Sequence, residues 1–267
     1  MAESAFSLSL PLRWLAEARD ALASILIPAP CRLCDALLRH SSRVPICQSC
    51  LDGFSRVPEK ICAVCGLPLP DITAVPAEDL RCAACRIGTY AFDFARSFAL
   101  YERQIVRAIV LLKFERIDPL AKWFAARLAE IVAKNPEALC ADVVVPVPLH
   151  RDREKERGYN QAELLSTHLA KILELPHQGV LLVRKRPRPT KLVLTLRERW
   201  AVVRGAFEIR PGSKVDNRRV LLLDDVMTTG ATLDACSKAL RDAGAKSVVA
   251  LTVARAAQNP LPAAGES

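Results

Sequence analysis

The chain has 267 residues, of which 51% are hydrophobic, so it has enough apolar surface for one large domain together with a small one. This composition excludes a chain that is disordered throughout. The formal net charge of +9 favours anionic partners such as phosphates, nucleic acid or acidic lipids. The sequence contains no run of about 18 apolar residues, the length that predicts a membrane-spanning helix.

The first 30 residues predict an amphipathic helix, because Leu12, Leu15, Leu22 and Leu26 fall on one side of it. Charged residues interrupt its apolar run, unlike the continuous run of a secretory signal. The helix is expected to pack against the rest of the protein, with contact to a membrane surface as the alternative. Without an export signal the expected compartment is the cytoplasm, where cysteines bind metals or catalyse reactions more often than they form disulfides.

Eight of the ten cysteines form four Cys-x-x-Cys pairs in a proline-rich segment. The pairs are Cys31 with Cys34, Cys47 with Cys50, Cys62 with Cys65, and Cys82 with Cys85. Because two pairs supply the four sulfurs of a tetrahedral zinc site, the pattern predicts two structural zinc sites. Sequential pairing is the simplest arrangement, a cross-braced one stays open, and redox or iron–sulfur chemistry is the alternative. The two remaining cysteines, Cys140 and Cys236, are expected to pack in the core.

From about residue 90 the pattern changes to strands that alternate with helices. The expected strands cover residues 92–100, 142–149, 220–223 and 248–253, and the expected helices cover 103–114, 119–134, 160–173 and 232–243. Continuous apolar strands between helices are typical of a parallel α/β sheet. The pattern therefore predicts an α/β domain over residues 90–256. A small cysteine-rich domain over 31–88 precedes it, and a disordered tail over 257–267 follows it.

The last expected strand–helix unit carries polar residues where the strand ends. The apolar strand 220–223 delivers Asp224 and Asp225 to the carboxyl edge of the sheet, where such folds bind ligands. The loop 227–232 then enters a helix, whose free N–H groups and dipole favour an anion. It lacks the Gly-Lys-Ser/Thr of a Walker A loop and suits one phosphomonoester. The carboxylates suit ribose hydroxyls or hydrated magnesium. An ordinary turn with a capping threonine is the alternative.

This string resembles the signature of type I phosphoribosyltransferases, which bind 5-phosphoribosyl-1-pyrophosphate (PRPP). The resemblance implies the type I phosphoribosyltransferase fold, with a parallel sheet flanked by helices, and magnesium bound together with PRPP. It also implies that Asp224 and Asp225 face the ribose hydroxyls. The residues that it assigns to the 5-phosphate are Met227, Thr228, Thr229, Gly230, Ala231 and Thr232.

The stretch 146–161, Pro-Val-Pro-Leu-His-Arg-Asp-Arg-Glu-Lys-Glu-Arg-Gly-Tyr-Asn-Gln, resembles the ComF family of competence-associated proteins. That family joins a double zinc ribbon to a phosphoribosyltransferase-like domain, and the resemblance covers nearly the whole chain. The implied pyrophosphate-binding candidates are Pro148, Leu149, His150, Arg151 and Arg157. A solvated charged face is the alternative for these arginines and for Arg153.

Other parts of the chain both follow and depart from the ComF pattern. Lys113-Phe114 resembles the family's Lys-aromatic pair, and Arg199 with the stretch Gly-Ala-Phe at 205–207 resembles a later motif. Val202 stands where the family carries Asn, and no Gln follows Thr190. These departures fall in the segment that corresponds to the hood over the base site of active enzymes.

The resemblance implies binding of PRPP or a related ribose phosphate, and a role in handling single-stranded DNA during natural transformation, with the DNA-uptake machinery as partner. As an enzyme, the protein would displace pyrophosphate from C1 of the ribose with a nitrogen nucleophile; whether it does so is left open. One alternative is a non-catalytic single-stranded DNA-binding accessory protein that uses the zinc ribbons and the basic run 184–191. Another is a structural remnant that keeps the phosphate loop only for stability.

Overall fold

The computed structural model describes residues 30–38, 44–70, 80–88, 90–136, 139–187 and 195–257. By their internal contacts the residues divide into two units, Met1–Gly53 and Phe54–Ser267. The expected N-terminal helix and C-terminal tail fall almost wholly outside the described residues, as does the end of the basic run. The domain boundaries expected from the sequence stay predictions. Among the described helices, none has the length and apolarity needed to cross a membrane.

The described part of the first unit is a small cysteine-containing fold. An isolated bridge joins Pro30 to Leu37, and the N–H of Cys31 donates to the carbonyl of Ala36 at 2.8 Å. The one-turn helix α2 (Gln48–Asp52) then begins directly after Cys47. A tight hairpin and a helical turn thus carry the two Cys-x-x-Cys pairs of this unit.

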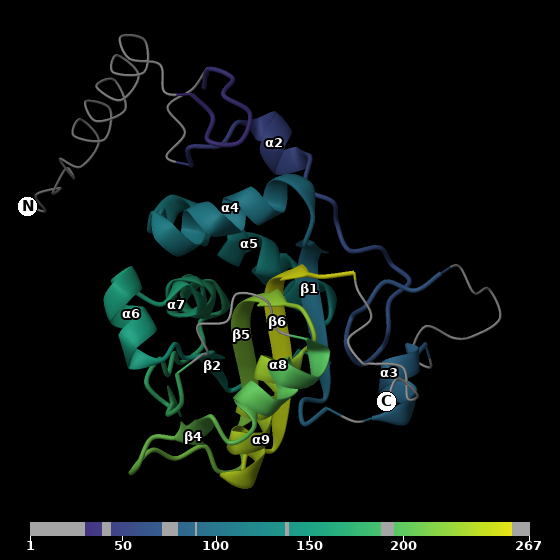
Figure 1. The fold of residues 1–267 in the computed structure, drawn as a ribbon, viewed down its shortest axis with the longest axis vertical. Helices are drawn as coiled ribbons and strands as arrows, with labels where there is room; N and C mark the ends of the chain where they lie inside the picture. Colours follow the sequence, from purple (N-terminus) through teal and green to yellow (C-terminus); the bar gives the residue numbers. More distant parts are fainter. Residues whose placement is uncertain are drawn as a thin grey trace, which may run out of the picture. The chain divides into compact units, whose positions relative to one another are not determined.

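The second unit is built on a parallel four-stranded sheet in the order β1-β6-β5-β2 (Figure 1). Its strands are β1 (Phe94–Leu100), β2 (Val143–Pro146), β5 (Arg219–Met227) and β6 (Ser247–Arg255). A separate antiparallel pair consists of β3 (Leu182–Arg184) and β4 (Phe207–Ile209). The helices of this unit are α3 (Ala83–Ile87), α4 (Arg103–Phe114), α5 (Asp118–Lys134), α6 (Arg151–Arg157), α7 (Gln161–Leu173), α8 (Leu196–Val203) and α9 (Ala231–Asp242). The predicted parallel α/β fold is confirmed.

The central strands contain continuous apolar runs, 220–223 in β5 and 248–251 in β6, because helices cover both faces of the sheet. Helices α5 and α7 pack against the strands on one face, and α9 packs on the other with α8 and the β3–β4 pair. In Figure 1, α8 and α9 lie over the near face of the sheet. Side chains alternate along each strand, so Val220 and Leu222 of β5 share the α9-side core with Leu233 and Leu240.

The second group of cysteines belongs to the same core as α9. The core cluster contains the cysteines at positions 62, 65, 82 and 85, together with Phe92 and Ala95 at the start of β1. Each of these four cysteines is at most 4% exposed. This part of the cysteine-rich segment therefore shares the interior of the sheet-containing unit.

Three elements differ from the expectation. Strand β5 does not end at Leu223 but continues to Met227, because it keeps pairing with β6 as far as Arg255. Between β2 and α7 lies helix α6, which was not predicted; its C-cap Gly158 adopts the left-handed conformation. The stretch 181–199 contains β3 and the start of α8, whose capping box pairs Thr195 with Glu198.

The two lone cysteines have different environments. Cys236 is fully buried on α9, as predicted. The prediction for Cys140 is wrong, because this residue lies exposed in the loop before β2. There its sulfur accepts a hydrogen bond from Nη1 of Arg219 at 2.7 Å, and the same guanidinium pairs with Asp142. The local polar cluster therefore keeps Cys140 at the surface.

Phe54, Trp123 and Phe124 form an aromatic cluster that can be used to test the core. Phe124 is fully buried, and its ring lies 5.4 Å from Trp123 and 6.1 Å from Phe54 between centroids. We expect Phe124→Ala to lower the free energy of unfolding by about 3–5 kcal/mol, because it leaves a cavity. Phe114→Ala makes the same chemical change at a side chain that is 64% exposed, and should cost below about 1 kcal/mol. Urea denaturation measures both, and equal losses would contradict the assignment of this core.

Candidate functional site

Asp225 is buried at the carboxyl end of β5 and is held by a cation. The residue is only 4% exposed, and its Oδ2 lies 2.8 Å from Nζ of Lys113. Gln161 Nε2 donates to the same oxygen at 3.3 Å, and Gln161 accepts a hydrogen bond from Arg157. Because a buried carboxylate is costly without partners, these contacts compensate its charge. They also bring α4, β5 and α7 together at one point.

The carboxyl group of Asp224 has a strongly raised pKa. Burial raises the pKa of Asp224 to about 8, and the negative charge of Asp225 adds to the increase. The backbone N–H of Asp225, which donates to Asp224 Oδ1 at 2.8 Å, and the ammonium of Lys113 act in the opposite direction. A cation that approached Asp224 would favour its ionised form. The charge of this carboxyl group therefore depends on what binds beside it.

The loop between β5 and α9 has the shape expected of a phosphate loop. Gly230 has φ +81°, and a Cβ at this position would lie 2.8 Å from Met227 Cε and 2.9 Å from Tyr90 Cε1. Only glycine fits both the left-handed backbone and the close packing. The hydroxyl of Thr229 accepts from the N–H of Ala231 at 3.3 Å, where α9 begins. The loop thus ends at a helix N-terminus, where N–H groups favour an anion.

The carboxylates and this loop open onto one cleft of about 330 Å³. The predicted residues that line it are Asp224, Asp225, Thr228, Thr232, Pro148, Leu149 and Arg157, and it is also lined by Tyr101, Lys113, Val147, Gln161, Arg184, Arg199 and Val226. The cleft brings together the carboxyl ends of β2 and β5, the end of α4 and the start of α7. Such an edge is where open α/β sheets bind ligands.

The other loop residues surround this cleft without lining it. Thr229 and Ala231 line a neighbouring cavity of about 60 Å³, together with Arg199 and Val202. Met227 is 1% exposed and packs in the α9-side core, so its contribution to the loop comes through its backbone.

The pyrophosphate candidates divide between two clefts. Pro148 and Leu149 line both the 330 Å³ cleft and an adjacent one of about 640 Å³, whereas His150 and Arg151 line only the larger one. His150 caps α6, since its Nδ1 accepts from the N–H of Asp152 at 3.3 Å. Arg153 lies exposed, 3.9 Å from Glu156, as expected for a solvated charged face. The roles of the candidates stay predictions.

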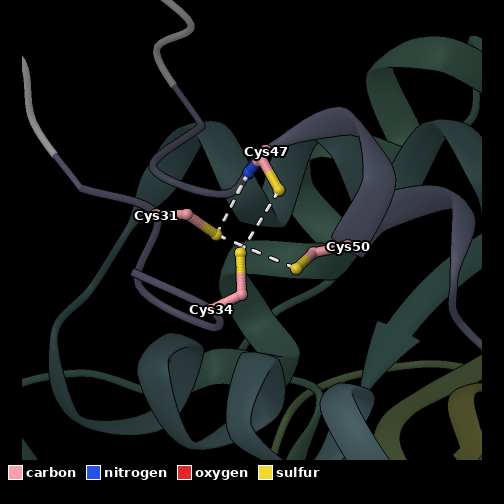
Figure 2. Close-up of side chains that lie close together, drawn as sticks. All are labelled: Cys31, Cys34, Cys47 and Cys50. Carbon is pink, nitrogen blue, oxygen red and sulfur yellow. Dashed lines mark hydrogen bonds between the residues drawn. The ribbon is translucent and has the colours of Figure 1, made fainter. Parts of the chain in front are cut away.

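The first cysteine group has the geometry of a tetrahedral metal site (Figure 2). The sulfurs of Cys31 and Cys50 are 3.9 Å apart, and those of Cys34 and Cys47 are 3.6 Å apart. Zinc–sulfur bonds of about 2.3 Å in a tetrahedron place the sulfurs about 3.8 Å apart, so four thiolates fit zinc here. The N–H of Cys47 also donates to the sulfur of Cys31 at 3.3 Å.

The second group, made by Cys62, Cys65, Cys82 and Cys85, repeats this local structure. In each group the N–H of the first cysteine closes a hairpin with a hydrogen bond of 2.8 Å, from Cys31 to Ala36 and from Cys62 to Leu67. The sulfurs of Cys65 and Cys82 are 3.7 Å apart, which again fits a tetrahedral ion. Sequential pairing is confirmed. The second group is wholly buried, whereas Cys34 of the first is exposed.

Comparison with known proteins finds one matching domain and several proteins similar over most of the chain. The family described as "Phosphoribosyl transferase domain" matches residues 160–264. "Competence protein F" of Haemophilus influenzae is 28% identical over 225 residues, which are 81% of this chain and 93% of the relative. "Competence protein ComFC" of Bacillus subtilis is 28% identical over 84% of this chain and 94% of its own. These matches agree with the resemblance to the ComF family. "DNA utilization protein YhgH" of Escherichia coli (strain K12) is another such relative, 29% identical over 83% of this chain and 95% of its own.

Gln161 and Tyr101 line the cleft, but neither was predicted as a site residue from the sequence. Gln161, which contacts Asp225, was placed on a helix but not in the site, and Tyr101 was not considered. Gln161 lies one residue after Asn160, whose side chain caps α7 and also donates to the Val147 carbonyl at 3.0 Å. Asn160 and Gln161 are polar residues at the start of a predicted helix, which is a usable signal for a site at this edge. Tyr101 directly follows β1, but a single aromatic residue there does not distinguish a site from packing.

The raised pKa of Asp224 predicts how stability changes with pH. In an unfolded chain this carboxyl group titrates near 3.8, but in the folded protein near 8. Between these values the folded state retains a proton that the unfolded state has lost, so stability decreases as pH rises from about 4 to about 8. The slope for one proton is at most about 1.4 kcal/mol per pH unit, and Asp224→Asn should remove it.

Chemical denaturation at a series of pH values measures this slope. Asp242→Asn makes the same change at an exposed residue of α9 that pairs with Lys238, and it should retain the slope of the wild type. A slope that Asp224→Asn leaves unchanged would contradict the proposed titration.

Proposed function

We propose that this protein binds PRPP, or a closely related ribose phosphate, together with magnesium in the 330 Å³ cleft. One observation carries the proposal: two carboxylates at the end of the central strand and a threonine loop at a helix N-terminus line the same cleft. The loop would bind an anion, and the carboxylates would bind hydroxyl groups or a metal ion. A single ribose would connect these two parts of the site. The phosphoribosyl transferase domain match supports the same ligand class.

The cleft offers a separate group for each part of the ligand. The loop that contains Thr228 and Thr232 would bind the 5-phosphate, and Asp224 and Asp225 would face the ribose hydroxyls. Arg157, from the end of α6, would bind the pyrophosphate. Magnesium would neutralise part of the negative charge of the pyrophosphate. The ionised carboxylate of Asp224 would hold the magnesium.

A transfer reaction at this site would need positioning and charge stabilisation more than covalent catalysis. Pyrophosphate would leave C1 of the ribose as a nitrogen nucleophile attacks, and the cationic side chains would stabilise the leaving group. The hood segment provides Val202 beside the loop, where the family pattern has a polar Asn. Binding of the ribose phosphate is therefore better supported than recognition of any base.

Calorimetry with PRPP and magnesium tests the proposal. We expect the wild type to bind in the presence of magnesium, and Asp225→Asn to weaken binding at least about tenfold, because a charge-assisted contact to the ribose and metal is lost. Asp242→Asn is the matched control on α9, outside the cleft, and should bind like the wild type. A wild type that binds no PRPP, or an Asp225→Asn variant that binds equally well, would contradict the proposal.

We further propose zinc as the metal of both cysteine groups, because four thiolates close a tetrahedral shell that suits it. The names of the relatives, which refer to competence and DNA utilization, support a role in handling incoming DNA in the cytoplasm. Such a role fits the excess of positive charge, which favours association with phosphates of nucleic acid.

Direct binding of single-stranded DNA is a second candidate function. The observation in its favour is the 640 Å³ cleft next to the carboxylate site, where Arg151, Lys185 and Arg210 gather from three different segments. Glu154, Glu163 and Glu208 also line it, and Lys185 pairs with Glu208, so the cleft is only moderately basic. A backbone-binding groove of this kind would give affinity without sequence preference.

Salt titration of binding to a labelled single-stranded oligonucleotide tests this second function. Replacing Arg151, Lys185 and Arg210 with Gln should lower the slope of log affinity against log salt by about 2, since each single-strand phosphate contact contributes about 0.7. Replacing the exposed Lys122, Lys134 and Lys171 with Gln removes the same charge elsewhere and should preserve the slope. Equal slopes for both triple variants would contradict DNA binding in this cleft.

A further inference from the structure

Arg255, the last residue of β6, is a fully buried cation that contacts both the phosphate loop and the second cysteine group. Its Nη1 donates to the carbonyl oxygens of Met227 at 3.2 Å and Thr228 at 2.6 Å. Its Nε donates to the carbonyl of Cys65 at 3.1 Å, and its Nη2 lies 3.8 Å from the Cys65 sulfur. A single side chain therefore joins the loop to a ligand residue of the predicted metal site.

A buried guanidinium needs a compensating negative charge. The partners of Arg255 in the described part of the chain are carbonyl oxygens and one sulfur. Four thiolates around one divalent ion carry a net charge of about −2, so the loaded cysteine group would supply that charge. The side chain is thus suited to a site that contains its metal.

Tyr90 makes a second connection from the same side. Its hydroxyl donates to the carbonyl of Thr229 at 3.0 Å, and its ring stacks on Phe92 at 4.5 Å and on Trp200 at 5.9 Å between centroids. Tyr90 follows the last ligand of the second group, Cys85, by five residues. The same ring occupies the space that a side chain at Gly230 would need.

These contacts determine which way the loop amides point. The carbonyls of Met227, Thr228 and Thr229 are all held from the side of Arg255 and Tyr90. In a planar trans peptide the C=O of one residue points opposite to the N–H of the next. The N–H groups of residues 228–230 are therefore directed away from the cysteine group, as an anion site at this loop requires.

We propose that Arg255 and Tyr90 are positioning residues that couple metal binding at the second cysteine group to the anion-binding shape of the loop 227–230. The metal fixes Cys65, Cys65 fixes Arg255, and Arg255 fixes the loop carbonyls. Because coupling between binding sites is reciprocal, a ligand on the loop should also slow loss of the metal. The coupling itself needs no ligand, whereas its effect on affinity rests on the proposed PRPP function.

Hydrogen exchange of the zinc-loaded, full-length protein gives the first test. Cys85→Ser should leave about one zinc per chain. It should also accelerate amide exchange at Ala231 and Asp234, whose N–H groups donate to Thr229 Oγ1 and to the Gly230 carbonyl of the loop, about tenfold or more. Cys50→Ser removes the equivalent ligand of the first group, should also leave about one zinc, and should preserve wild-type exchange at these two amides. Equal exchange at these amides in both folded variants would overturn the coupling.

Two milder substitutions test the connection without removing a ligand, and they decide the question if Cys85→Ser does not fold. In a Cys50→Ser background, where the remaining zinc belongs to the second group, Arg255→Lys and Tyr90→Phe should accelerate both this amide exchange and chelator-driven zinc loss severalfold. Tyr159→Phe removes a hydroxyl bonded to the Leu112 carbonyl and should change neither. Wild-type values for both Arg255→Lys and Tyr90→Phe would overturn the proposal.

The ligand arm separates this inference from the proposed function. PRPP with magnesium should slow zinc loss in the Cys50→Ser background, and the effect should shrink once Arg255→Lys is added. PRPP that binds without changing zinc loss would overturn the coupling. A protein that binds no PRPP, but in which Arg255→Lys still accelerates the amide exchange and zinc loss, would overturn the proposed function and support the coupling.

Discussion

Two charges buried at the carboxyl end of the sheet constrain everything around them. Asp225 near the end of β5 and Arg255 at the end of β6 are at most 4% exposed, although they lie where polar groups usually reach solvent. A buried charge that loses its partner costs several kcal/mol, so each one dictates the position of its neighbours. Asp225 holds the end of α4 through Lys113, and Arg255 holds the Cys65 hairpin. The loop 227–230, for which we propose phosphate binding, follows Asp225 in the chain and is held by Arg255 through its carbonyl oxygens.

Much of the fold was predictable because its signals are local. Continuous apolar runs identified the strands, and helical spacing placed α4 at its observed bounds, Arg103–Phe114. The spacing of the cysteine pairs predicted two four-sulfur groups. The capping box of Thr195 and Glu198 was equally local, and it could have predicted α8, which lies where no helix was predicted.

The parts that were not predicted depend on contacts between distant residues. Two aspartates after an apolar run indicate a strand end, yet β5 continues through them because β6 offers pairing partners as far as Arg255. Arg255 lies 190 residues from Cys65, and Tyr90 lies 139 residues from Thr229. Neither has a local sequence pattern that distinguishes it from a solvated arginine or an ordinary core tyrosine. Cys140 is exposed for a similar reason, since Arg219 follows it by 79 residues.

The two cysteine groups have the same local structure and different surroundings, and the surroundings decide what each can influence. A short segment with few apolar side chains cannot build its own core and needs a metal or a neighbour to stabilise it. The second group has a neighbour, because its four sulfurs share the interior with Phe92 and the loop residue Met227. A metal held there is part of the core that shapes the carboxyl edge of the sheet. In the first group one of the four cysteines, Cys34, is exposed, so a metal there would lie closer to solvent. A repeated sequence motif therefore does not by itself imply a repeated role.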